Sequence, residues 1–300
     1  QKGTLSIRGP KGFAIEPSQV DVDLEKAGEE MDIPLVIVPS GQASQGDMKA
    51  RFEGTNGQTM NQSLIQIAYD HIPDQIYLPE AACRVVNIDL KKAGEKIGYI
   101  EGAGDVIPEV LSSIGYNVQI LGEGDLKSMD LQAFDAIILG IRALNTQNRI
   151  DYMMPLLLDY CENGGTLVLQ YNTSYRMKTS NFAPYPLQLS RDRVTQEDAP
   201  VEFLLPEHPV LNRPNKLTKA DFDGWVQERG LYFPDEWDDQ YEAILRWNDT
   251  GESPKDGSLL IADYGQGHYI YTGISLFREL PAGVPGAYRL LANIVSYGHE

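Results

Sequence analysis

The chain has 300 residues, of which 42% are hydrophobic, enough for one large or two ordinary globular domains. Its formal net charge of −18, without any basic patch, disfavours nucleic acid and anionic lipid as partners. No apolar run reaches the length of a membrane span, and Cys83 and Cys161 form neither a CxxC motif nor a disulfide framework. The chain begins at Gln1 without methionine or signal sequence. We therefore expect an excised fragment whose export signal, if present, lies elsewhere.

Residues 1–93 are predicted to form an all-β domain of the immunoglobulin-like sandwich type. Val20, Val22 and Leu24 alternate with polar residues, as in a strand with one buried face. Further strand-like runs, separated by Gly, Asn and Pro, cover residues 33–38, 48–52, 63–68 and 84–90. Short strands with turn residues between them, and no helical period, are typical of a β-sandwich.

Residues 94–300 alternate between strand-like and helical patterns, which predicts an α/β domain with a parallel sheet and helices on both faces. Helical faces are expected within residues 106–114, 150–161 and 287–295. Pro155 inside the second of these predicts a kink or two short helices. The expected strands cover residues 96–101, 117–121, 135–140, 166–171 and 268–273.

Four stretches directly follow predicted parallel strands, where open α/β sheets bind their ligands. They are residues 101–105, 140–145, 171–174 and 275–278. Because the carboxyl ends of parallel strands share one edge, we expect the four stretches to meet. The candidate ligand-binding residues among them are Glu101, Arg142, Asn172 and Arg278.

Residues 221–242 combine tryptophans with many carboxylates and show no clean helical or strand period. They are predicted to form a long ordered loop, either the wall of a binding site or a cap over the core. In the first case the tryptophan rings stack on sugar rings, the acids accept hydroxyl hydrogens, and the arginine pairs with an acidic group. The candidates are Asp221, Asp223, Trp225, Glu228, Arg229 and Trp237.

Other motifs favour no cofactor and no metal. Gly102 and Gly104 lack the third glycine of a dinucleotide fingerprint and indicate a tight turn instead. No phosphate-binding loop occurs, and the histidines do not have metal-ligand spacing. The run of acids at residues 235–239 leaves calcium binding as an alternative to a solvated surface.

The nucleophile expected after the fourth strand is replaced by Tyr171, Asn172 and Thr173, which leaves Ser174 as the one plausible nucleophile. His208 is a conceivable base for it, although prolines flank that histidine. Cys161 lies on an apolar helical stripe, where a cysteine usually belongs to the core.

Several motifs together carry a family resemblance: KIGYIEGAGDVIPEVL, FDAIILGIRAL, ENGGTLVLQYNTS, PEHPVLNRP and GQGHYIYTG. Over about residues 95–298 the chain resembles a class I glutamine amidotransferase-like domain, with the flavodoxin-like fold also found in ThuA-like proteins. With DFDGWVQERGLYF, the likeness extends to the C-terminal region of large LmbE-like (PIG-L family) deacetylases of Bacteroidetes-type bacteria. That resemblance implies a missing N-terminal zinc deacetylase domain, then a β-sandwich, then this α/β domain.

The chain departs from the amidotransferase pattern at its catalytic positions. Tyr-Asn-Thr stands where the nucleophilic cysteine is expected, and ISLFREL contains no histidine where a His-x-Glu pair is expected. The zinc signature of the deacetylases is also absent. These departures predict that the amidotransferase triad is lost.

Three functions remain open from the sequence. The first is a non-catalytic accessory region of a sugar N-deacetylase, periplasmic or extracellular, that binds carbohydrate or another small polar ligand. The second is an independent glycoside or ester hydrolase that uses Ser174 or an Asp/Glu pair within residues 221–242. The third is a surface that docks the missing catalytic domain.

Overall fold

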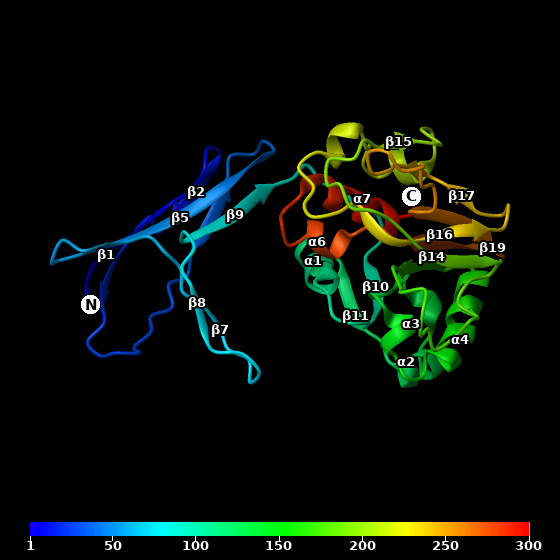
Figure 1. Ribbon diagram of the computed structural model, residues 1–300, viewed down its shortest axis with the longest axis horizontal. Coiled ribbons are helices and arrows are strands. Elements are labelled where there is room, and N and C mark those ends of the chain that lie inside the picture. Colours follow the sequence, from blue (N-terminus) through cyan, green and yellow to red (C-terminus); the bar gives the residue numbers. More distant parts are fainter. Residues whose placement is uncertain (300) are drawn as a thin grey trace. The chain divides into compact units, whose positions relative to one another are not determined.

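The computed structural model describes residues 1–299 (Figure 1). They divide into two compact units, Gln1–Asp89 and Leu90–Glu300. The sequence predicts the domain boundary slightly later, between residues 93 and 94. No helix among the described residues is both long and apolar enough to cross a bilayer.

The first unit consists of antiparallel strands with a small core. Its main sheet has the order β3-β1-β5-β6, with β9 also paired to β5, and β2–β4 and β7–β8 form separate ribbons. Within residues 1–89 the buried hydrophobic side chains are Ile7, Ile15, Val22 and Val85. The strands are β1 Lys2–Arg8, β2 Phe13–Glu16, β3 Gln19–Asp23, β4 Val36–Pro39, β5 Ser44–Gly54, β6 Thr59–Met60, β7 Ile65–Ile67, β8 Gln75–Tyr77 and β9 Ala82–Asn87.

The second unit is built on a seven-stranded mixed sheet with the order β11-β10-β12-β13-β20-β19-β17. All neighbours from β11 to β20 pair in parallel, as the sequence predicts, whereas β19 and β17 add an antiparallel edge that it does not. The sheet strands are β10 Lys96–Ile100, β11 Asn117–Ile120, β12 Ala136–Leu139, β13 Thr166–Gln170, β17 Glu242–Ala243, β19 Leu259–Tyr264 and β20 Gly267–Thr272.

Two short ribbons accompany this sheet, β14 with β16 and β15 with β18. The prediction of a long loop at residues 221–242 is wrong, because β16 occupies its centre. The pairing of β14 with β16 contains register shifts, and Pro234 lies within β16. Such an irregular strand lacks the alternation by which strands are recognised. The ribbon strands are β14 Leu187–Val194, β15 Glu202–Phe203, β16 Gly230–Trp237 and β18 Leu245–Arg246.

Helices cover both faces of the sheet (Figure 1). Along β12, Ala136 and Ile138 belong to a core shared with α1 and α7, while Ile137 and Leu139 belong to the opposite core, shared with α2 and α4. Contrary to one expectation, α4 is a single helix with Pro155 inside it. The helices are α1 Ile107–Ser113, α2 Glu123–Ser128, α3 Ala143–Thr146, α4 Ile150–Glu162, α5 Pro209–Asn212, α6 Leu276–Glu279 and α7 Pro285–Val295, with 3₁₀ turns η1 Leu131–Ala133 and η2 Lys219–Phe222.

Candidate functional site

The four stretches that follow parallel strands meet at the carboxyl edge of the sheet, as predicted. The Ile141 N–H donates to the Asp105 carboxylate over 3.2 Å, and the Arg142 N–H donates to the Tyr171 carbonyl over 2.8 Å. The rings of Tyr171 and Phe277 lie 5.3 Å apart. The strand order reverses between β10 and β12, so this edge includes the switch point where open α/β sheets leave a crevice.

Asp105 fixes the loop after β10. Its carboxylate accepts hydrogen bonds from the Tyr99 hydroxyl at 2.7 and 2.6 Å and from the Ile107 N–H at 3.0 Å. Burial of the ring, with the negative charge of Asp105 beside it, raises the pKa of Tyr99 well above its usual range. Tyr99 therefore remains a neutral donor, and the pair holds the start of α1 against β10.

The two glycines of this loop have backbone reasons that require no phosphate. A Cβ at Gly102 would overlap the Ile141 carbonyl, so only glycine allows the loops after β10 and β12 to approach so closely. Gly104 has φ +93°, in the left-handed region that favours glycine. The tight-turn interpretation of this motif agrees with the structure.

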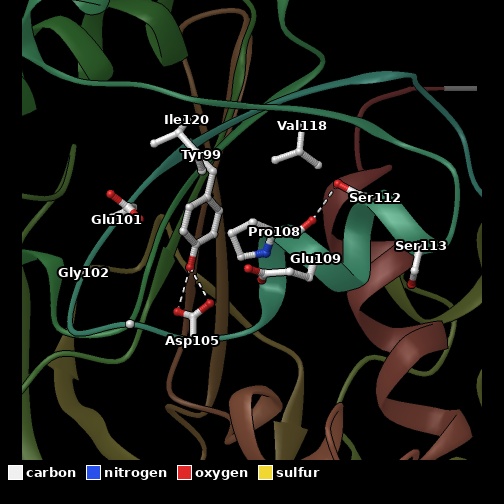
Figure 2. Close-up of a pocket in the computed structure, with 11 residues that line it drawn as sticks. Tyr99, Glu101, Gly102, Asp105, Pro108, Glu109, Ser112, Ser113, Val118 and Ile120 are labelled. Carbon is white, nitrogen blue, oxygen red and sulfur yellow. Dashed lines mark hydrogen bonds between the residues drawn. The ribbon is translucent and has the colours of Figure 1, made fainter. Parts of the chain in front are cut away.

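A cavity of about 710 Å³, here called the Tyr99 cavity, lies beside this loop (Figure 2). Figure 2 shows Tyr99 pointing toward Asp105, with Pro108 and Glu109 of α1 beside its ring. The cavity is acidic, because three of its eleven lining residues are Glu101, Asp105 and Glu109 and none is a lysine or an arginine. The eleven residues are Tyr99, Glu101, Gly102, Gly104, Asp105, Pro108, Glu109, Ser112, Ser113, Val118 and Ile120.

Of the candidates predicted near the strand ends, only Glu101 lines the Tyr99 cavity. Asn172 is fully buried. Its side chain is satisfied within the protein, since it accepts a hydrogen bond from the Leu144 N–H and donates one to the Gln170 carbonyl. Arg142 is exposed at φ +58°. Arg278 forms an ion pair with the buried Glu228.

Among the candidates between residues 221 and 242, the side chains of Trp225, Glu228 and Arg229 are buried in the core and do not form a surface. Trp225 is 3% exposed and packs with Phe222 and Trp247 at ring distances of 5.3 and 6.1 Å. The stacking of a sugar on Trp225 is incompatible with this burial. Of the two predictions for this segment, the structure favours the cap over the core.

Arg229 is buried too, at 3% exposure. It donates to the carbonyls of Ala199 and Phe222 at 2.7 and 2.6 Å, and its guanidinium lies 5.3 Å from the Trp225 ring. Since its donors are directed at backbone acceptors, pairing of Arg229 with a ligand acid does not fit the structure. Arg229 therefore packs inside the protein against the rings of Trp225 and Trp247.

The remaining candidates of this segment are scattered. Asp221 pairs with Arg289 and accepts from the Thr218 N–H. Asp223 is exposed, and Trp237 is half-buried against the core on the α4 side of the sheet. The segment therefore does not gather its acids and rings around one cavity.

Sequence reasoning missed Glu109, Ser112 and Ser113, which line the Tyr99 cavity from α1. The helical pattern marks only the apolar face of this helix, and in the sequence its polar face does not differ from ordinary surface. An i, i+3, i+4 set of Glu and Ser on a helix that follows a strand-end loop is the available signal.

It also missed Glu279, whose side chain has no solvent exposure. One of its carboxylate oxygens accepts from the Val226 N–H at 2.9 Å, and the other has no hydrogen-bond partner among the described residues. Burial raises the pKa of Glu279 to about 7, although that hydrogen bond and the nearby Arg229 charge oppose the shift.

The groups needed for nucleophilic catalysis lie away from the strand-end loops. His268 lies next to Gly267 at the start of β20 and contacts Asp263, whereas His299 contacts Asp135 before β12. His208 contacts Glu242, and burial lowers the pKa of this imidazole. None of these three histidines, which are those of residues 90–299, forms a hydrogen bond with Ser174.

Burial also raises the pKa of the Cys161 thiol to about 12, which makes it a poor nucleophile. The calcium alternative at residues 235–239 gains no support, since residues 1–299 contain no group of three or more His, Cys, Asp or Glu side chains placed to hold a metal ion.

Comparison with known proteins gives remote structural similarity only. No protein-family model matches the chain, and no curated protein matches it in sequence. A cytoplasmic protein of Salmonella typhimurium aligns at 16% identity and TM-score 0.47, covering 67% of this chain and 98% of its own. A protein of Thermoplasma acidophilum, named as part of a GMP synthase, aligns at 11% identity and TM-score 0.42, covering 68% and 94%.

A β-galactosidase of Rahnella sp. R3 aligns at 13% identity and TM-score 0.40, covering 67% of this chain and 31% of its own. With TM-scores below 0.5, these similarities transfer no activity.

Proposed function

We propose that residues 90–300 form a non-catalytic binding unit for a small hydroxyl-rich ligand, a saccharide or amino sugar, held in the Tyr99 cavity. The observation that carries the proposal is an acidic cavity of ligand size at the switch point of the sheet. Its volume of about 710 Å³ lies within the range of small-molecule sites.

The lining of the cavity matches the two kinds of surface on a sugar. Carboxylates accept hydrogen bonds from hydroxyl or ammonium groups, and Glu101 and Glu109 are the carboxylates not committed to the loop. The side chains of Pro108, Val118 and Ile120, which are partly or fully exposed, offer apolar surface to C–H faces. An acidic lining repels phosphate and carboxylate, which favours a neutral or cationic ligand over a nucleotide.

The hydrolase alternative is less well supported. No histidine among residues 90–299 forms a hydrogen bond with Ser174, and two of the three acids proposed as a pair are engaged, Asp221 with Arg289 and Glu228 with Arg278. A carboxylate held in an ion pair is a weak acceptor for a substrate proton. These contacts favour binding without turnover.

The setting of this proposal comes from the sequence motifs. The strand order β11-β10-β12-β13-β20 is the 2-1-3-4-5 order of flavodoxin-like sheets, which supports an amidotransferase-like unit. We further propose that this unit and an immunoglobulin-like first unit accompany a periplasmic or extracellular sugar N-deacetylase domain. The sequence resemblance is what supports this setting.

The test is calorimetric titration of the full chain with neutral saccharides and amino sugars, using Glu109→Gln and a control, Glu207→Gln. Glu207 is exposed and does not line the cavity. Loss of one charge-assisted hydrogen bond of about 1.5 kcal/mol weakens binding about tenfold. The control is expected to bind as the wild type does.

Equal loss in both variants, or no binding of any of these sugars at millimolar concentration, would contradict the proposal. Turnover of chromogenic glycosides or esters that disappears in Ser174→Ala would instead restore the hydrolase alternative.

A further inference from the structure

A second cavity, of about 390 Å³, has the opposite character to the Tyr99 cavity. It lies against the β14–β16 ribbon, and we call it the arginine–tyrosine cavity. Two cations and no anion are among its lining residues, although the whole chain carries a net charge of −18. They are Tyr175, Arg191, Arg193, Leu231 and Tyr232.

Asp192, the acid between these two arginines in the sequence, does not neutralise them, because it is paired with Lys255. Arg191 and Arg193 of β14 both line the cavity, whereas Asp192 between them does not. Asp192 accepts from the Lys255 ammonium at 2.9 Å and is thereby neutralised. Neither arginine takes part in an ion pair among residues 1–299.

The acid whose charge acts on Arg193 is Asp249, which is also engaged. Asp249 is 7% exposed, and its two oxygens accept from the backbone N–H groups of Thr195 and Gln196 and from the Thr195 hydroxyl. Burial opposes the shift, but those hydrogen bonds, with a smaller contribution from the Arg193 charge, lower the pKa of Asp249. The guanidinium of Arg193 remains exposed and available.

Aromatic rings form the other wall. The Arg191 guanidinium lies 5.7 Å from the Tyr175 ring, which meets Tyr232 edge-on at 6.4 Å. Tyr232 in turn stacks on the buried Tyr171 at 6.1 Å. The rings thus give a rigid apolar surface directly beside a planar cation.

The backbone under this wall is strained. Tyr232 has φ +52°, a left-handed conformation that a bulky residue seldom adopts. The Tyr271 hydroxyl donates to the Tyr232 carbonyl at 3.0 Å and holds the peptide in place. Strained non-glycine residues concentrate at ligand sites, where the surrounding structure over-determines them.

A third cation, in the loop after β12, does not line the cavity but carries a charge that acts on Tyr232. Arg142, also left-handed at φ +58°, is anchored by its N–H to the Tyr171 carbonyl, and no ion pair among the described residues engages its side chain. Burial raises the pKa of Tyr232, and the charges of Arg191 and Arg142 both oppose that shift. Positive charge from two separate elements therefore acts on one tyrosine hydroxyl.

We infer that the arginine–tyrosine cavity binds the oxyanion of a small ligand, a carboxylate or a phosphate, with the body of the ligand against Tyr175 and Tyr232. A guanidinium offers paired donors that match both oxyanions, and the two exposed arginines of β14 supply them from one face. Because the whole chain repels anions, such a site needs a local excess of free cations, which these residues provide.

The experiment is titration of the full chain with inorganic phosphate, glucose 6-phosphate, glucuronate and glucose at low ionic strength. Glucuronate and glucose 6-phosphate distinguish carboxylate from phosphate as the preferred oxyanion, and glucose tests whether the charge is required. At least one anionic probe is expected to bind with an affinity that falls as salt is added, whereas any binding of glucose in the Tyr99 cavity is expected to be insensitive to salt.

Arg191→Gln is compared with Arg8→Gln, which removes the same charge from an exposed position on β1. We expect Arg191→Gln to lose at least tenfold in affinity at unchanged melting temperature, and Arg8→Gln to stay within twofold. Glu109→Gln is expected to keep its affinity for the anion, which separates this site from the Tyr99 cavity.

The inference is overturned if no anionic probe binds, or if the anionic probes lose no more affinity in Arg191→Gln than glucose, which is also a ligand expected for the Tyr99 cavity. It is also overturned if Arg191→Gln binds as the wild type does, or if Arg8→Gln loses as much, since binding would then follow net charge alone. If Arg191→Gln unfolds, Arg191→Lys replaces it, which keeps the charge, removes the paired donors and is expected to weaken binding.

Discussion

The structural role of Trp225 predicts a large loss of stability on truncation. Its ring is 3% exposed, packs on Phe222 and Trp247, and lies 5.3 Å from the Arg229 guanidinium. Replacing a buried tryptophan by alanine costs about 3–5 kcal/mol, and the lost partner of the buried Arg229 places Trp225→Ala toward the upper end. For a unit of this size that corresponds to a fall in melting temperature of about 10 °C.

Two further variants, Trp225→Phe and Trp237→Ala, are expected to lower the free energy of unfolding by less than Trp225→Ala does. The first keeps a ring but loses the hydrogen bond of 2.9 Å from the indole N–H to the Asp221 carbonyl, a cost of about 1–2 kcal/mol. The second removes a half-buried ring and is expected to cost about 2 kcal/mol. All three tryptophans lie after residue 90, so tryptophan fluorescence during urea unfolding follows the second unit alone.

The opposite pattern would refute this reasoning. If Trp225→Ala lowered the free energy of unfolding by less than about 1 kcal/mol and yet abolished saccharide binding, Trp225 would be a ligand contact. The core role assigned to residues 221–229 would then be wrong.

Two further predictions concern buried positions of the second unit. Because burial raises the folded-state pKa of Glu279 from 4.5 to about 7, its ionisation opposes folding: the penalty is absent below pH 4.5, grows between pH 4.5 and 7, and reaches about 3 kcal/mol above that range. Glu279→Gln should therefore gain stability relative to the wild type as pH rises from 4.5 to 8, and a constant difference in urea unfolding would contradict this. A Cβ at Gly286 would overlap the Asp221 carbonyl, so Gly286→Ala should lose about 2 kcal/mol or more, whereas Gly124→Ala, with open space around it in α2, should be neutral or stabilising by calorimetry.

Elements with a regular period were predictable from the sequence. The apolar face that includes Ile107 and Leu111 became α1, and the buried runs at residues 96–101, 135–140 and 166–171 became neighbouring parallel strands. Their order along the chain was sufficient to bring the strand-end loops to one edge. Local patterning and chain direction carry that information.

Features that depend on contacts distant in sequence were not predictable. The cluster of acids and rings at residues 221–242 has the composition of a surface, because nothing local shows that Arg229 bonds to Ala199 or that Trp225 packs on Trp247. β14 and β16 are irregular and pair across more than 30 intervening residues, so neither has a clear period. The charges of Arg191 and Arg193 likewise acquire meaning only once Tyr232 lies beside them.

The most direct test of the proposed function is backbone NMR mapping of the ligand site in the deuterated chain during addition of a saccharide that binds by calorimetry. The proposal predicts that the perturbed amides cluster at residues 101–113 and 118–120, around the Tyr99 cavity, and that Glu109→Gln reduces the shifts. Perturbations confined to residues 221–242, or to the arginine–tyrosine cavity, would contradict it.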